Sequence, residues 1–122
     1  MITTEKIQEE ALGFTGIQIK NITGIINACE SLLSGEILGW NSGSTFNHLA
    51  VQLNDERWVI FHSETGDVSL SDKKYKEGKD IYNAFWEEPE NVTEIYYKRK
   101  GDNFPVRQLV SSILKERTET YK

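Results

Sequence analysis

A strand–turn–strand pattern in the middle of the chain constrains its fold more than any other feature. Apolar residues dominate Phe46–Leu53 and Arg57–His62, which is typical of strands that belong to a core. The polar residues at 54–56 between the two segments are typical of a turn. The sequence therefore predicts an antiparallel hairpin that carries His48 near its start and His62 near its end.

Shorter patterns on both sides of the hairpin predict further helices and strands. We expect helices at Thr4–Leu12, from Thr23 along an apolar stripe to Leu33, and at Pro105–Glu116. We expect short strands at Ile17–Lys20, Asp67–Leu70 and Val92–Lys98. Gly39–Ser44 is predicted to be a loop, and Lys73–Trp86 forms either a helix or two short turns around Gly78.

This order of elements, α-β-α-β-β-β-α-β-α, favours the α+β class, in which a small antiparallel sheet is flanked by helices. The length of 122 residues suits one hydrophobic core. We therefore expect residues 1–122 to form a single domain.

Charge and composition argue against several classes of protein. The formal net charge of −5 is unsuited to a non-specific nucleic-acid binder, which needs a basic face. The N-terminal stretch has no apolar signal region, and no apolar run is long enough to span a membrane. We therefore expect no nucleic-acid or membrane partner, and a cytoplasmic protein or, if a phage encodes it, a component of the virus particle.

The two histidines are the first candidates for a functional site. An imidazole with an unperturbed pKa of about 6.5 serves as a general base close to neutral pH. Alternation places His48 on the same strand face as Ala50 and Gln52, and a tight turn brings His62 beside it. The spacing of these histidines and Glu64 matches no known metal motif, so we expect neither a metal ion nor another cofactor.

Cys29 and Trp40 are the other side chains that a function could use. Cys29 is the only cysteine, which excludes an internal disulfide and makes it the only sulfur nucleophile. It falls on the apolar stripe of a helix, beside Glu30 and away from the helix N-terminus, so we expect a buried and unreactive thiol. Trp40 lies in the predicted loop, where we expect it to be exposed and available as a binding contact.

The hairpin and its flanks resemble the circularly permuted papain-like hydrolases, a group that includes the NlpC-type cell-wall amidases and the lecithin:retinol acyltransferase-like enzymes. The segment STFNHLAVQLNDERWVIFHSE is similar to their histidine hairpin, with His48 at the place of the catalytic histidine and His62 at that of a second polar residue. In this resemblance GIQIKN is the opening strand, TGIINACESLLSG is the helix that follows it, and GDVSLSDKKY is the next short strand.

The resemblance implies a papain-like sheet with a groove, yet the family's nucleophile has no counterpart here. In that family the catalytic cysteine follows the histidine, whereas no cysteine follows Cys29 in this chain. The resemblance therefore implies a shortened, non-catalytic member that keeps its groove for binding.

Three functions are compatible with these patterns. The first is a non-catalytic papain-like domain that binds a protein partner or has a structural role, as phage accessory proteins do. The second is a cysteine hydrolase, of amidase or acyltransferase type, in which Cys29 acts with His48. The third is a toxin-neutralising immunity or inhibitor protein whose acidic face covers a basic site. The distance between Cys29 and His48 distinguishes the first function from the second, because a hydrolase needs these two side chains close together. An acidic cluster beside an exposed Trp40 would favour the third function.

Overall fold

The structure is a computed structural model that describes residues 2–43, 47–64, 68–71, 73–87 and 95–97. Its elements are α1 (Thr4–Glu10), α2 (Gly16–Ala28), a 3-10 turn (Glu30–Leu32), β1 (Leu33–Asn41), β2 (Asn47–Leu53), β3 (Trp58–His62), β4 (Val68–Leu70), α3 (Gly78–Glu87) and β5 (Ile95–Tyr97). The five strands pair in sequence order, each antiparallel to the next. The expected α+β class, with a small antiparallel sheet and flanking helices, is confirmed.

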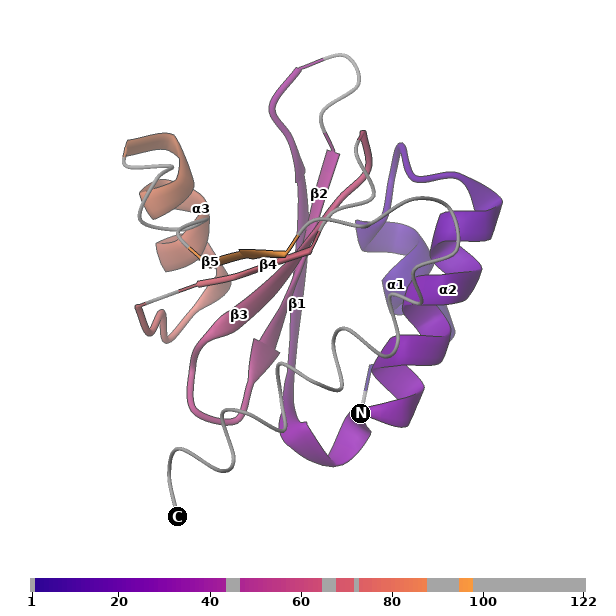
Figure 1. Cartoon of the computed structure of the whole chain (residues 1–122), viewed down its shortest axis with the longest axis horizontal. Coiled ribbons are helices and arrows are strands. Elements are labelled where there is room, and N and C mark those ends of the chain that lie inside the picture. The colour runs from indigo at the N-terminus through magenta and orange to yellow at the C-terminus, as the bar shows by residue number, and fades with distance from the viewer. Residues whose placement is uncertain (1, 44–46, 65–67, 72, 88–94, 98–122) are drawn as a thin grey trace.

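The sheet separates two layers of helices (Figure 1). The pair α1 and α2 lies against one face and α3 against the other. Alternate residues of β2 divide between two cores, because successive side chains of a strand point to opposite faces. Leu49 and Val51 pack in the larger core with residues of α1 and α2, whereas Ala50 packs with Ile81 of α3.

The predicted hairpin is confirmed in β2 and β3. The turn between them is closed by a hydrogen bond from the Leu53 N–H to the Arg57 carbonyl oxygen, at 2.7 Å. Glu56 in this turn has a φ of 74°, which places it in the left-handed region. The resulting register puts His48 directly opposite His62.

The N-terminal region differs from the expectation, because Ile17–Lys20 belongs to helix α2 and is not a strand. Thr15 and Gln18 form a capping box there. The Thr15 hydroxyl accepts from the Gln18 N–H at 3.1 Å, and the Gln18 side chain accepts from the Thr15 N–H at 2.9 Å. The helix therefore begins at Gly16 and not at Thr23, whose hydroxyl bonds a carbonyl oxygen one turn earlier in the same helix.

The predicted first helix is confirmed as α1, which ends at Glu10 and is capped by Thr3. The Thr3 hydroxyl accepts a hydrogen bond from the Lys6 N–H at 3.1 Å.

The segment Leu33–Asn41 is a strand, where we expected a helix end and a loop. Gly39 in this strand is needed for the close packing of α1 against β1. A Cβ at Gly39 would collide with the carbonyl oxygen of Glu10, at the end of α1. The Gly39 N–H also donates to the Glu10 carboxylate at 3.1 Å. Gly39 therefore lets α1 approach the backbone of β1 closely, and the loop prediction for this part of the chain is wrong.

The later elements follow the expectation where the structure describes them. β4 confirms the third short strand, and α3 shows that the ambiguous segment Lys73–Trp86 contains a helix. β5 lies within the strand expected at Val92–Lys98. The helix expected at Pro105–Glu116 lies outside the described residues.

Candidate functional site

A row of four side chains crosses the sheet on the side of α3. Trp40 of β1 lies opposite His48 of β2, which lies opposite His62 of β3. Ser69 of β4 completes the row, because its hydroxyl oxygen is 2.7 Å from His62 Nε2. We call Trp40, His48, His62 and Ser69 the imidazole row. The structure therefore brings together three of the residues singled out from the sequence and adds a fourth.

The aromatic rings of the imidazole row pack against one another and against α3. Trp40 and His48 are stacked, with ring centroids 5.3 Å apart and planes 13° apart. His48 and His62 meet edge to face at 5.0 Å. Phe85 of α3 covers this group, with its ring centroid 4.7 Å from that of His48 and 5.2 Å from that of Trp40. These contacts hold the His48 ring between two strands and a helix.

The environment of His48 disfavours its charged form. Burial lowers the pKa of His48 from 6.5 to about 4, and the neighbouring His62 contributes in the same direction. His48 is therefore neutral at pH 7. A general base works best when its pKa lies near the working pH, so this imidazole is poorly matched to base catalysis at neutral pH.

Two polar atoms of the imidazole row, His48 Nδ1 and Trp40 Nε1, are buried and have no hydrogen-bond partner in the part of the chain that the structure describes. Both side chains are nearly inaccessible, with exposed fractions of 7% and 8%. Each buried polar atom without a partner costs about 1–3 kcal/mol. The ring contacts of Trp40 and His48 with each other and with Phe85 have to offset this cost for both side chains to stay buried.

Ser69 is the member of the imidazole row that was not among the candidates from the sequence. A serine hydroxyl beside a histidine nitrogen has the geometry of a nucleophile and its base. Ser69 is fully buried, however, so a substrate carbonyl group has no path to its oxygen in this structure. Finding this pair from the sequence would have required the β3–β4 register, in which Ser69 lies opposite Ile60.

Cys29 lies in the other core, on the far side of the sheet from His48. Its thiol packs with apolar residues of α1, α2 and the sheet face that they cover, and 7% of its surface is exposed. The expected burial of Cys29 is confirmed, although the residue caps the end of α2 and does not lie within the helix. The structure does not bring Cys29 and His48 together as a nucleophile and a base.

The expected exposure of Trp40 is wrong. Trp40 lies in β1 and is 8% exposed, because its ring fills the space between His48 and α3.

Glu64, considered as a third metal ligand, is exposed after the end of β3. Within the described ranges, no three His, Cys, Asp or Glu side chains are grouped closely enough to hold a metal ion.

Two aromatic side chains of α3 lie at the surface above the imidazole row. Tyr82 is 39% exposed and Trp86 is 50% exposed. Their ring centroids are 6.1 Å apart, and Tyr82 also meets the buried Trp40 edge to face at 6.1 Å. We call Tyr82 and Trp86 the α3 aromatic surface. It is the exposed end of a continuous set of ring contacts that begins at His62.

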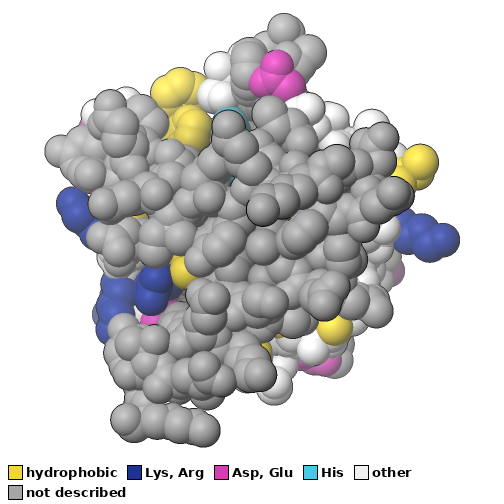
Figure 2. All heavy atoms as spheres, in the orientation of Figure 1, with side chains coloured by type: hydrophobic (Ala, Val, Ile, Leu, Met, Phe, Trp, Pro, Cys, Tyr) yellow, Lys and Arg dark blue, Asp and Glu magenta, His cyan; other side chains and the backbone are white. Residues whose placement is uncertain are grey.

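The charges close to α3 differ from the charge of the whole chain. Figure 2 shows Lys and Arg side chains (dark blue) along the side of the molecule where Figure 1 draws α3. Residues 73–87 carry three acidic side chains and four exposed lysines, which are Lys73, Lys74, Lys76 and Lys79. The formal net charge of residues 73–87 is therefore +1, although the chain has a formal net charge of −5.

None of the helices in the described part of the chain combines the length and the hydrophobicity that a membrane-spanning segment needs.

No protein-family model, curated protein or solved structure matches this chain.

Proposed function

We propose that this protein acts by binding another protein and not by catalysis, with the α3 aromatic surface as its contact. The exposure of Tyr82 and Trp86 is the observation that supports this proposal most strongly. Clustered apolar side chains on a protein surface often mark an interaction site. Tyrosine and tryptophan also contribute a large share of the binding energy in protein interfaces.

The packing beneath the α3 aromatic surface supports the same proposal. Ile81 is fully buried and fixes α3 on the sheet, while Phe85 fills the space between Trp86 and His48. Rings that are already held in place lose little conformational freedom when a partner binds. The imidazole row therefore has a supporting role in this proposal and does not touch the partner itself.

The local charge favours a largely apolar and neutral partner surface. Charges more than about 8 Å apart are largely screened at physiological ionic strength. A partner at α3 consequently meets the near-neutral surface of residues 73–87 more than the net charge of the whole chain. Residues 73–87 do not form the acidic face over a basic site that the toxin-neutralising alternative expects.

Three observations weigh against catalysis. His48 has a lowered pKa, Ser69 is buried, and Cys29 lies across the sheet from His48. A toxin-neutralising role remains one form of the proposed binding function, although Trp40 is no longer a candidate contact because it is buried.

A papain-like relationship stays a narrower proposal, supported by the histidine hairpin alone. Residues 16–21, the expected opening strand, lie in α2, which removes one part of the resemblance. The proposed binding function does not depend on this relationship or on a phage origin.

Site-specific crosslinking in the cells that naturally contain the protein tests the proposal. Benzoylphenylalanine at position 82 is expected to capture one discrete partner, whereas the same group at position 17 is not. Ile17 is a matched control, because it is apolar and 76% exposed but lies in α2, away from the α3 aromatic surface.

The affinity of the purified partner then gives the decisive measurement. Trp86→Ala is expected to weaken binding at least about tenfold, as removal of an interface hot spot does. Ile17→Ala should leave the affinity unchanged. Equal crosslinking at positions 17 and 82, or an unchanged affinity of Trp86→Ala, would overturn the proposal.

A further inference from the structure

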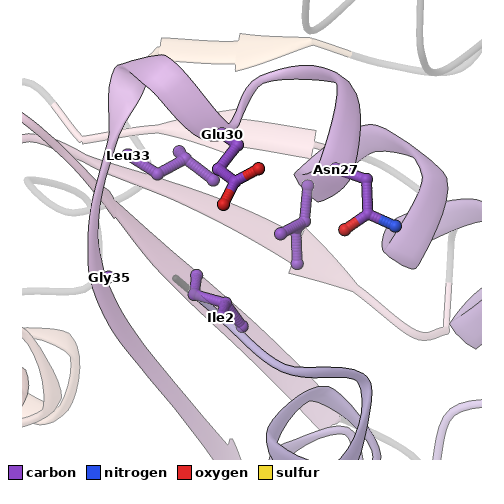
Figure 3. Close-up of a pocket in the computed structure, with 6 residues that line it drawn as sticks. Ile2, Asn27, Glu30, Leu33 and Gly35 are labelled. Carbon is purple, nitrogen blue, oxygen red and sulfur yellow. The ribbon is translucent and has the colours of Figure 1, made fainter.

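A second candidate site lies on the opposite side of the sheet from α3, where α2 passes into β1. A pocket of about 210 Å³ is lined there by Ile2, Ile26, Asn27, Glu30, Leu33 and Gly35 (Figure 3). Pockets that take whole small molecules usually have about 300–1,000 Å³. This pocket is therefore better matched to a single side chain than to a complete metabolite.

One part of the pocket wall is apolar, formed by Ile2, Ile26 and Leu33, and the other part is polar. Ile2 and Ile26 belong to the larger core and are 7% and 3% exposed, and Leu33 packs against the same core. These three side chains are held in place by the packing below them. They offer a fixed apolar surface to a hydrocarbon chain.

Among the described residues that line the pocket, Glu30 alone is charged, and Asn27 adds an amide. Among the described residues, no Lys or Arg side chain lies within ion-pair distance of the Glu30 carboxylate. Figure 3 shows the carboxylate of Glu30 directed toward the space between Leu33 and Ile2. A cation at this position would gain an ion pair without breaking one that already exists.

The N-terminal part of the chain, which supplies the residues of this pocket, has an excess of acidic side chains. Residues 2–43 carry five glutamates against the two lysines Lys6 and Lys20, which gives this region a net charge of −3. Opposite charges attract at short range, and the attraction also raises the rate at which a charged partner arrives.

We propose that this pocket binds the side chain of a lysine residue from a protein partner. The four-carbon stem of the lysine would pack on Ile2, Ile26 and Leu33, and its ammonium group would meet the Glu30 carboxylate. Lysine side chains often bury their stems on apolar surface while the charged group stays near water. The pocket is separate from the α3 aromatic surface, so this inference does not rest on the proposed function.

Titration with a lysine analogue tests the inference directly. The probe is Nα-acetyl-lysine N-methylamide, and the control compound is the norleucine analogue, which has the same stem without the ammonium group. Methyl NMR signals of Ile2, Ile26 and Leu33 are expected to shift in a saturable way with the lysine probe. The norleucine analogue should bind more weakly.

A pair of charge variants locates the ammonium group. Glu30→Gln is expected to weaken binding of the lysine probe by up to about fivefold, the range for a solvent-exposed ion pair. Glu36→Gln removes the same charge from an exposed position in β1 that does not line the pocket, and it should leave binding unchanged. Unaltered methyl signals, equal binding of the two compounds, or equal effects of the two variants would overturn the inference.

Discussion

His48 and His62 lie directly opposite each other on neighbouring strands, with ring centroids 5.0 Å apart. Two imidazoles at this distance repel each other when both are protonated. Because His48 is also buried, its pKa falls from 6.5 to about 4. The free energy of unfolding should therefore depend on pH through this pair of histidines.

Acidification should destabilise the protein through His48. Between pH 6.5 and about pH 4 the unfolded chain binds a proton at His48 that the folded chain does not. The contribution of His48 to stability is therefore complete above pH 6.5 and is lost as the pH falls toward about 4. The loss amounts to up to about 3 kcal/mol, since one pKa unit corresponds to about 1.4 kcal/mol.

Urea unfolding at a series of pH values measures this effect. His48→Phe is the matched control, because it keeps a ring between Trp40 and Phe85 but cannot be protonated. The variant should lose less stability than the wild type between pH 7 and pH 4.5. The same pH dependence in both proteins would show that other groups cause the acid effect.

The thiol of Cys29 should react slowly in the native protein. It is 7% exposed and packs in the core beneath α1 and α2, so a reagent reaches it only when that core opens. Labelling with a thiol reagent at neutral pH should accelerate strongly in denaturing urea. Rapid labelling of the folded protein would contradict this expectation and would show that the end of α2 opens easily.

The sequence predicted the β2–β3 hairpin because its information is local. Two short apolar runs joined by a polar turn identify both strands without knowledge of the rest of the chain. The same reasoning placed His48 and His62 on adjacent strands, and the register confirms this.

The errors around α2 and β1 have different causes. The first is local, because Ile17–Lys20 alternates over only four residues and the Thr15–Gln18 capping box starts a helix there. The second arises because a distant contact overrides the local pattern. Gly39 was interpreted as a loop residue, whereas its role depends on α1, which is 29 positions away from it at Glu10. The wrong expectation that Trp40 is exposed has the same cause. Trp40 was placed in a loop, whereas it lies in a strand and its ring packs against α3.

A pair of glycine substitutions tests the close approach of α1 to β1. Gly39→Ala should destabilise the protein by about 2–3 kcal/mol, because the added methyl group meets the Glu10 carbonyl oxygen. Gly16→Ala is the matched control, since a Cβ there meets nothing within 4 Å and alanine favours a helix more than glycine does. It should be neutral or stabilise by up to about 1 kcal/mol. Thermal unfolding of the two variants checks both expectations, and equal stabilities would contradict the proposed packing.

Substitution of Ser69 tests whether its hydrogen bond to His62 has a structural or a catalytic role. Ser69→Ala removes the hydroxyl that lies 2.7 Å from His62 Nε2 and leaves that buried contact unmade. We expect a loss of about 1–2 kcal/mol in the free energy of unfolding. Ser31→Ala removes a hydroxyl from an exposed serine and should change stability by less than about 0.5 kcal/mol.

The same Ser69→Ala variant should have no enzymatic activity to lose. The wild-type protein, Ser69→Ala and His48→Ala are compared in peptidase, amidase and esterase assays under conditions in which all three are folded. We expect no turnover above the buffer rate, because Ser69 is buried and the lowered pKa of His48 makes it a weak base at pH 7. Turnover by the wild type that Ser69→Ala abolishes would instead identify the imidazole row as an active site, with Ser69 as its nucleophile. Turnover that His48→Ala abolishes but Ser69→Ala retains would point to water activated by His48.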